Sequence, residues 1–366
     1  MNINLNKDVL IKPLQLINGV VERRQTLPIL ANMLVEIENG ILSLTATDLE
    51  VEIVAQLGID AKSNGRVTLP ARKLFDICRS LADGADVSIQ TEEEKATVKS
   101  GRSRFVLTTL PADDFPDIGE MEDARSFTIS QGELKRLIEQ TGFAMAQADV
   151  RYYLNGMLFE MGSEQLRMVA TDGHRLAMAE STVAIGWNEK TQVIVPRKGV
   201  LELQRLLEDS DEDVNIELGA NHIRFTTDGM SFTSKLVDGR FPDYEHVVPK
   251  NGDKIVIADK DSLKQALVRA SILTNEKFRS ISVEVNKGSL VIHARNPEQE
   301  HAEEQVEVDY NGEEFEIGFN AAYVQDALGA MNEQQVQIIF TDPSSSCLMH
   351  GVANETSRYV VMPMRI

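Results

Sequence analysis

The segment VATDGHRLAM, residues 169–178, places an acid, a turn residue and an imidazole within five positions, from Thr171 to Arg175. A histidine can act as a general base when a carboxylate holds its imidazole in the correct tautomer. His174 near Asp172 is therefore a candidate acid–base pair of a hydrolase, with a nucleophile supplied from elsewhere in the chain. The alternative is a turn in which Asp172 binds nearby backbone and Gly173 permits the bend.

Length, charge and cysteine content limit the class of protein. The chain has 366 residues, a net charge of −20 and 42% hydrophobic residues, which is typical of a globular protein with two or three domains. It has no basic segment followed by a long apolar run, and no stretch of about 18 apolar residues, so we expect neither a signal peptide nor a membrane span. Cys78 and Cys347 form no Cys-x-x-Cys pair, which argues against structural zinc and suits a reducing compartment. We expect a cytoplasmic protein with no metal and no cofactor.

A threefold internal repeat organises the chain. Three similar segments, each offset by 124 residues from the last, are LSLTATDLEVEIVA (42–55), LRMVATDGHRLAMA (166–179) and, more weakly, LVIHARNPEQEHAE (290–303). The tripeptide Phe-Pro-Asp also recurs, at 115–117 and 241–243. Units of about 122 residues are too long for solenoid repeats, so they indicate three domains of common ancestry. We place these domains at 1–124, 125–250 and 251–366.

Within each unit the hydrophobic period switches between the values typical of strands and of helices. In the first unit, alternating segments at 33–37, 42–45 and 51–55 are separated by Asn39-Gly40 and Thr47-Asp48, whose composition suits hairpin turns. Each domain is thus predicted to contain two βαβββ halves, which gives an α+β fold with six helices. The predicted helices lie within 6–17, 70–81, 130–140, 196–207, 259–271 and 318–331.

The repeat bears on the candidate acid–base pair. Thr47-Asp48 occupies in the first unit the position of Thr171-Asp172 in the second, so a turn role for the aspartate explains both copies. Only the second unit then continues with His174, Arg175 and Leu176, where the first has Leu49, Glu50 and Val51. We infer that the second copy diverged to bind a partner; the alternative is a surface turn with a solvated histidine and arginine.

Longer motifs carry a resemblance to a known family over essentially the whole chain. The most specific are RYYLNGMLFE (151–160), ATDGHRLA (170–177), VIVPRKGV (193–200), SKLVDGRFPDY (234–244), NPEQE (296–300) and YVVMPMRI (359–366). With these motifs the chain resembles the bacterial sliding clamp, the β subunit of the replicative DNA polymerase. The resemblance implies three tandem DNA-clamp domains and a head-to-tail homodimer ring around double-stranded DNA, with helices lining the hole and sheets outside. It also implies a processivity factor that is not an enzyme.

Charge is distributed unevenly between the predicted helices and the rest of the chain. The six helix ranges carry a net charge of +5, which leaves −25 for the remainder of a chain whose total is −20. Helices facing the hole would then contact phosphates loosely, while an acidic exterior would discourage binding elsewhere; ordinary helix surface is the alternative explanation. No helix carries an array of asparagines or arginines suited to reading base edges, so we predict binding that is independent of sequence.

The resemblance implies particular DNA contacts. The matching residues are Arg24, Arg72, Tyr152, Tyr153, Arg197 and Lys198. For the two tyrosines, packing in the core is the alternative to stacking on DNA. Family members often carry a glutamine before the position of Asp149, where this chain has Ala148.

A peptide-binding pocket between the second and third domains is a further implication of the resemblance. We expect it to bind replicative and translesion DNA polymerases, the clamp loader, and mismatch-repair and ligase-type proteins. The matching residues converge from distant parts of the chain and are Leu154, Thr171, Gly173, His174, Arg175, Leu176, Pro242, Val247, Asn320, Tyr323, Ser346, Val360, Met362, Pro363 and Met364. Flexible Met362 and Met364 suit a groove that accepts several partners. Packing of a C-terminal strand on its own core is the alternative for Val360, and Ser344 stands where the family can have an aliphatic residue.

We also formulate a hypothesis for the contact between two chains. The strand from Phe105 to Leu107 would pair across chains with the region of Ile272 and Leu273. Around it, Arg102 and Arg104 would face the acidic residues Glu298, Glu300, Glu303 and Glu304. Ion pairs at the rim contribute about 0 to 1 kcal/mol each, so the apolar contact should dominate the stability of the dimer.

Overall fold

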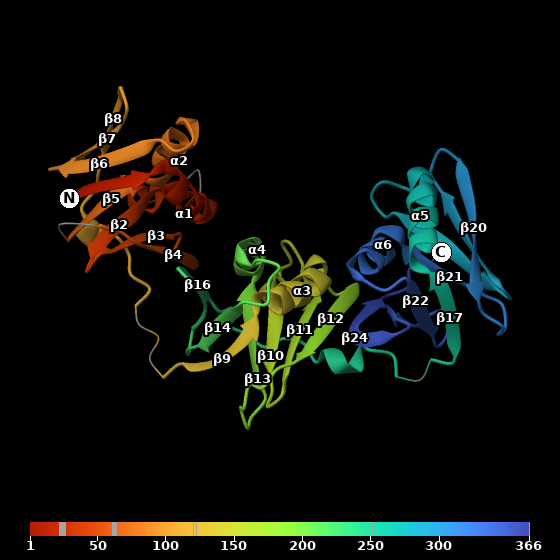
Figure 1. The fold of residues 1–366 in the computed structure, drawn as a ribbon. Helices are drawn as coiled ribbons and strands as arrows, with labels where there is room; N and C mark the ends of the chain where they lie inside the picture. The colour runs from red at the N-terminus through yellow and green to blue at the C-terminus, as the bar shows by residue number, and fades with distance from the viewer. Residues whose placement is uncertain (22–26, 61–63, 120, 122, 251, 366) are drawn as a thin grey trace. The chain divides into compact units, whose positions relative to one another are not determined.

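The computed structural model describes residues 1–366 except 22–26, 61–63, 120, 122, 251 and 366. A unit of one strand, one helix and three strands recurs six times along the described residues (Figure 1). This order confirms the predicted α+β fold of three tandem domains with two βαβββ halves each.

The six α-helices of the described residues are α1 (Lys7–Val20), α2 (Ala71–Ser80), α3 (Gln131–Thr141), α4 (Arg197–Leu206), α5 (Lys260–Ala270) and α6 (Ala321–Ala330). The strands of the first domain are β1 (Asn2–Asn6), β2 (Asn32–Glu38), β3 (Ile41–Thr47), β4 (Val51–Gly58), β5 (Gly65–Pro70), β6 (Asp86–Glu92), β7 (Lys95–Ser100) and β8 (Ser103–Thr108). The second has β9 (Arg125–Ser130), β10 (Gly156–Met161), β11 (Gln165–Thr171), β12 (Arg175–Thr182), β13 (Thr191–Pro196), β14 (Asp213–Leu218), β15 (His222–Thr227) and β16 (Met230–Lys235). The third has β17 (Lys254–Asp259), β18 (Ser280–Asn286), β19 (Ser289–Arg295), β20 (His301–Asp309), β21 (Phe315–Asn320), β22 (Gln335–Phe340), β23 (Cys347–Gly351) and β24 (Asn354–Val361). Three short 3₁₀ helices matter below: η4 (Tyr152–Leu154), η5 (Tyr244–His246) and η6 (Ser271–Leu273).

Helix boundaries follow local signals in the sequence. The Asn6 side chain accepts a hydrogen bond from the Asp8 amide at 2.9 Å and so caps α1. Asp259 caps α5 in the same way, accepting from the Ser262 amide at 2.8 Å. Helix α1 extends beyond its predicted end at Ile17 because Val20 follows at helical spacing and both side chains are buried.

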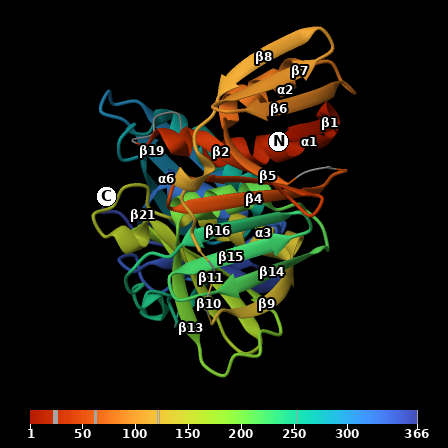
Figure 2. The ribbon, with the colours of Figure 1, turned by 90° about the vertical axis from the view of Figure 1, so that its left-hand side faces the viewer.

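The chain divides into two compact units, Met1–Gly132 with Leu201–Leu236, and Glu133–Val200 with Val237–Ile366. The first unit contains an eight-stranded sheet in the order β5-β2-β3-β4-β16-β15-β14-β9 and a four-stranded sheet in the order β1-β6-β7-β8. Helices α1 and α2 pack on each other, and α1 also contacts β1, β3 and β4 (Figure 2). The pairing of β4 with β16 joins strands of the first and second repeats.

The second unit is built on one twelve-stranded sheet in the order β13-β10-β11-β12-β24-β23-β22-β17-β20-β19-β18-β21. Its pairing of β12 with β24 joins strands of the second and third repeats, as β4 and β16 do in the first unit. Helices α5 and α6 contact each other, and α6 also contacts β24. Strands of neighbouring repeats are therefore hydrogen-bonded into continuous sheets.

Both cysteines are buried in the core and are free thiols. Burial raises the pKa of the Cys78 thiol to about 11 and that of Cys347 to about 12. Among the described residues, none of the helices is long and apolar enough to cross a membrane. The same residues contain no group of three His, Cys, Asp or Glu side chains arranged to hold a metal ion.

Candidate functional site

The turn between β11 and β12 is closed by its own side chains. Thr171 Oγ1 donates to the Arg175 carbonyl at 2.6 Å and accepts from the Gly173 amide at 3.1 Å. One oxygen of Asp172 accepts from the amides of His174 and Arg175, at 2.9 and 3.0 Å. Gly173 has a φ of 86°, a left-handed conformation that glycine adopts without a steric cost. Asp172 is thus a turn residue, as the repeat indicated.

The hydrolase interpretation is wrong, because both oxygens of the Asp172 carboxylate bind donors other than the imidazole. Its second oxygen accepts from Arg175 Nε at 3.1 Å. The His174 ring instead stacks on Tyr323 of α6, with 6.3 Å between the ring centroids and 17° between the planes. No acid–base pair forms between these two described residues.

Arg175 connects the turn to α6. Its guanidinium pairs with Asp172 and Asp326, donates to the Phe143 carbonyl at 2.8 Å, and lies 4.6 Å from the centre of the Tyr323 ring. Only 12% of the side chain is exposed. Its charge is satisfied within the chain, so Arg175 positions His174 and Tyr323 and offers little of its own charge to a ligand.

The contacts of Arg175 with Phe143 and Asp326 were not predicted from the sequence. They lie 32 and 151 residues from it in the chain. No local pattern signals such a contact, whereas the turn itself has a clear local signature.

Nine strand and loop residues near the turn form one buried hydrophobic cluster. We call this group the apolar cluster: Leu176 and Val360, which pair across β12 and β24, together with Leu158, Val169, Met178, Ile194, Phe241, Tyr244 and Leu348. Val247, Val248 and Tyr153 pack against it and are partly buried. Val360 is 1% exposed and belongs to the core, as its alternative interpretation stated.

We use the name docking surface for the fifteen residues predicted to line the pocket, and they differ in their exposure. The Met362 amide donates to the His174 carbonyl at 2.9 Å, and the Met364 amide donates to the Gly318 carbonyl at 2.8 Å. His174, Pro242 and Met362 are exposed. Partly buried members are Gly173, Val247, Asn320, Tyr323, Ser346, Pro363 and Met364, and buried ones are Leu154 and Thr171. Asn320 also caps α6, accepting from the Ala322 amide at 2.9 Å, so the structure assigns it a local role.

A buried polar network holds η5, the short helix between Pro242 and Val247. Tyr244 donates to the carboxylate of Glu160 at 3.1 Å, and Arg167 donates to the Tyr244 hydroxyl at 3.0 Å. Glu160 is 4% exposed; burial by itself raises its pKa, but hydrogen bonds from Lys190 and Gln192 hold the pKa below its usual value. The network was not predicted, although Glu160, Arg167 and Glu180 lie opposite one another on β10, β11 and β12.

The predicted DNA contacts differ in their surroundings. Arg24 lies outside the described residues. Arg72 donates to the Val21 carbonyl at 2.8 Å, at the C-terminal end of α1, and Arg197 donates to the Met145 carbonyl at 3.1 Å. Lys198 is partly buried in the first turn of α4. Both arginines thus have a structural role at a backbone carbonyl.

Tyr152 and Tyr153 differ in exposure, which bears on the choice between core packing and stacking on DNA. Tyr153 is partly buried against the apolar cluster, which is the core-packing alternative. Tyr152 is 57% exposed and meets the Tyr153 ring edge-on at 5.8 Å. Stacking on a base is therefore open to Tyr152 in this conformation.

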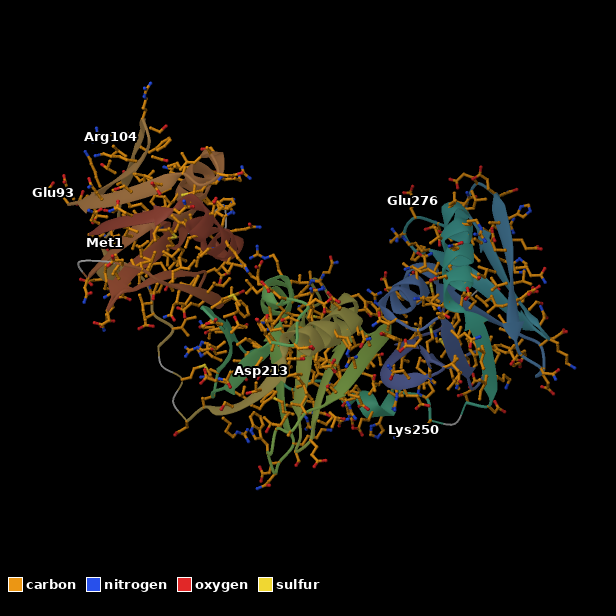
Figure 3. All side chains as sticks on the ribbon, in the orientation of Figure 1. Met1, Glu93, Arg104, Asp213, Lys250 and Glu276 are labelled. Atoms are coloured by element: carbon orange, nitrogen blue, oxygen red, sulfur yellow. The ribbon has the colours of Figure 1, made fainter. Side chains whose placement is uncertain are left out.

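Each unit contains part of the predicted chain–chain contact. In the first, β8 is an edge strand of the four-stranded sheet, and Arg104 extends from it away from the sheet (Figure 3). Leu107 is buried in its own domain and Phe105 is partly buried, while Val106 is 51% exposed.

In the second unit, Ile272 and Leu273, the residues predicted to lie at the contact with the partner's β8, are not part of a strand. Both residues lie in the 3₁₀ helix η6, which offers no strand edge, although Ile272 is 76% exposed. Of the four acidic residues, Glu304 forms an ion pair with Arg269 of its own chain, and Glu300 accepts a hydrogen bond from Asn296.

Comparisons with known proteins agree over the full length. Models of the DNA polymerase III β subunit match its N-terminal domain at residues 1–119, its central domain at 128–243 and its C-terminal domain at 245–365. The chain is 54% identical to the beta sliding clamp of Pseudomonas aeruginosa and 50% identical to that of Escherichia coli K12, with 100% of each chain covered. A solved structure of the P. aeruginosa sliding clamp bound to griselimycin has a TM-score of 0.97 at 54% identity, and a Caulobacter crescentus beta sliding clamp has 0.95 at 40%, both with full coverage of each chain. The chain therefore belongs to the family of DNA polymerase III β subunits, the bacterial sliding clamps.

Proposed function

We propose that this chain is a DNA sliding clamp, a non-enzymatic processivity factor that encircles double-stranded DNA and tethers DNA polymerases through the docking surface. The observation that carries the proposal is full-length similarity to beta sliding clamps in three tandem domains. We assign the domains to 1–124, 125–250 and 251–366, and the site of action to the cytoplasm, where the bacterial chromosome lies.

Retention on DNA by encirclement needs no strong individual contact. A closed ring cannot dissociate sideways, so contacts to phosphate can stay weak enough for the DNA to move. Arg72, Tyr152, Arg197 and Lys198 are the described residues that we propose to contact DNA, with Arg24 as a further candidate. Because these contacts carry no base readout, the position on DNA is independent of sequence.

The docking surface is proposed as a shared site for several partners. Its floor is the pair Leu176 and Val360, and its rim includes Met362, a flexible and polarisable side chain that adapts to different ligands. We propose translesion polymerases, the clamp loader, and mismatch-repair and ligase-type proteins as partners besides the replicative polymerase. The relative crystallised with griselimycin supports a ligand-binding surface in this family.

Run-off from cut DNA tests the proposal directly. The protein is loaded on nicked circular DNA by a clamp loader with ATP, the DNA is cut once, and bound protein is measured by gel filtration. We expect retention on the circle and loss from the linear product, with retention restored when both ends are blocked by bound protein. Persistence on open linear DNA would show that the protein holds DNA by direct binding instead of encirclement.

The ring is proposed to close through side-chain contacts of Ile272 and Leu273 and through strand pairing at β8. Strand β20 pairs with β17 only at Val308 and Asp309 among the described residues, so the rest of that edge is open to a strand of another chain. We propose that β8 of the partner pairs there, in place of the pairing at η6.

Replacing Ile272 and Leu273 together with alanine is expected to convert the dimer to monomers. Ile272 is 76% exposed in the single chain, and the alanine variant loses apolar area that we propose the partner chain buries. Sedimentation velocity measures the change, and Ile255→Ala, at an apolar residue of β17 that is 44% exposed, serves as the control that leaves the dimer intact. An undiminished dimer in the double variant would remove Ile272 and Leu273 from the interface.

A further inference from the structure

Neighbouring domains are joined by strand pairing at two places, which we call the first and second seams. The backbone is the same at both seams. In the first seam β4 pairs with β16, and Glu52 lies opposite Thr233. In the second seam β12 pairs with β24, and Leu176 lies opposite Val360. Glu52 and Leu176 are separated by 124 residues, the offset of the internal repeat. The two pairs therefore occupy equivalent positions.

The equivalence extends to individual hydrogen bonds. Asp48 accepts from the amides of Glu50 and Val51 at 2.9 and 2.8 Å, as Asp172 does from the corresponding amides of its turn. Leu49 has a φ of 76°, where Gly173 has 86°. Just beyond the paired residues of the first seam, the Lys235 amide donates to the Glu50 carbonyl at 2.8 Å. In the second seam the Met362 amide donates to the His174 carbonyl at 2.9 Å.

The loops that follow the first and second repeats match as well. Phe115 and Phe241 are both buried, at 7% and 6% exposure, and each precedes a proline and an aspartate. Asp117 lies close enough to Glu52 to raise the pKa of that carboxyl. The first unit thus supplies the backbone counterpart of the floor and wall of the docking surface.

The side chains at the two seams differ in one consistent way. Four apolar residues of the second seam have polar counterparts in the first: Leu176 corresponds to Glu52, Leu348 to Arg224, Val360 to Thr233 and Met362 to Lys235. We call the four residues of the first seam the polar set. Arg224 Nε donates to Thr233 Oγ1 at 3.0 Å, and Thr233 is fully buried, so the set is built into the sheet.

We propose that the polar set determines specificity: it closes the first seam to the apolar peptide that the docking surface binds, so that one chain binds one peptide. The inference rests on the proposed docking function. An apolar side chain that covered Glu52 and Arg224 would remove both from water without offering them a hydrogen bond, which is unfavourable. Rejection by polar groups at an otherwise suitable site is a common route to specificity.

Burial already affects the most important member of the set. Glu52 is 8% exposed, and burial raises its pKa to about 7, an effect that Arg224 partly offsets. Charged or neutral, its carboxyl presents polar atoms where Leu176 presents methyl groups. The difference between the seams therefore holds across the physiological pH range.

Reciprocal exchange between the seams tests the inference, with griselimycin, a ligand of a solved relative, as the probe in isothermal titration calorimetry. The full-length dimer is expected to bind one griselimycin per chain. The variant Glu52→Leu, Arg224→Leu, Thr233→Val and Lys235→Met is expected to bind a second. The reverse variant, Leu176→Glu with Val360→Thr, is expected to lose affinity roughly a hundredfold at the second seam. Glu52→Gln, which keeps a polar group of the same size, should stay at one.

The outcomes separate the inference from the function on which it depends. A folded, dimeric quadruple variant that still binds one griselimycin would overturn the inference, as would a wild-type chain that binds two. Should the quadruple variant fail to fold, the reverse variant decides, and unchanged affinity there overturns the inference. If the wild-type chain binds none at all, the proposed docking function fails instead.

Discussion

Replacing Arg167 with alanine is expected to lower the free energy of unfolding of the middle domain by about 3 kcal/mol, the lower end of the range for breaking a buried ion pair. Arg167 lies on β11 between Glu160 and Glu180, and it pairs with Glu160 at 3.2 Å and with Glu180 at 2.8 Å. Without Arg167, the Glu160 carboxylate keeps other hydrogen bonds but loses the positive charge beside it. The Glu160 side chain is only 4% exposed. Lys190 remains beside Glu160 at 2.9 Å, which is why we expect the lower end.

Trp187 makes this measurement specific to one part of the chain. It is the only tryptophan of the sequence, and it is buried in the same unit as Arg167. Denaturant unfolding followed by its fluorescence therefore reports on the compact unit that contains Arg167. Lys190→Ala is the matched control, because a side chain that is 51% exposed should contribute about 1 kcal/mol or less. Equal losses in both variants would mean that burial of the network does not govern its strength.

The network also links stability to the docking surface. Arg167 and Glu160 hold the Tyr244 hydroxyl, and Tyr244 belongs to η5, which is flanked by Pro242 and Val247. Loss of Arg167 should therefore weaken peptide binding as well, although no atom of Arg167 belongs to the predicted docking surface. Such indirect effects are typical of residues that hold a binding element in place.

Glu52→Gln is expected to stabilise the first unit in a way that depends on pH. The pKa of Glu52 is raised by burial from 4.5 to about 7 in the folded protein. Below pH 4.5 the carboxyl is protonated in both the folded and the unfolded chain and contributes nothing. Between 4.5 and 7 the unfolded chain loses the proton while the folded chain keeps it, so the stability of the wild type falls as pH rises. Above 7 the cost reaches about 3 kcal/mol, since one pKa unit corresponds to about 1.4 kcal/mol.

Calorimetric melting at pH 5.5, 6.5 and 8 measures this effect as a difference between wild type and variant. The advantage of Glu52→Gln should grow from about 1 kcal/mol at pH 5.5 to about 3 kcal/mol at pH 8. Glu50→Gln is the control, because Glu50 is exposed two residues earlier and should change stability by less than about 0.5 kcal/mol. A constant difference between wild type and Glu52→Gln at all three pH values would contradict an elevated pKa.

Features with a local physical cause were predictable from the sequence. The Asn39-Gly40 turn joins β2 to β3 with φ values of 51° and 79°, as a two-residue hairpin requires. All six helices fall where hydrophobic residues recur at helical spacing, within a few residues at each end. The turn role of Asp172 followed from the repeat, because Thr47-Asp48 has no histidine after it.

Features that depend on distant partners were not predictable. Glu52 alternates with Val51 and Ile53 and so suggests a solvent-facing strand position, yet it is buried where β16 of the next repeat pairs alongside. Arg175 looks like a free surface charge until Asp326, 151 residues away, is placed beside it. The geometry of η6 was missed because a short apolar pair such as Ile272-Leu273 suits a strand and a helical turn equally well.

The burial of both thiols has a practical consequence for following the protein on DNA. Thiol reagents attack the thiolate, and the pKa values of Cys78 and Cys347, about 11 and about 12, leave almost none of it at neutral pH. A single cysteine introduced at an exposed position such as Glu93 would then be the preferred target of a maleimide dye. Cys78 and Cys347 would not need to be replaced. One fluorophore per chain can therefore be attached at a chosen site while both natural cysteines are kept. The diffusion of individual labelled molecules along DNA can then be tracked.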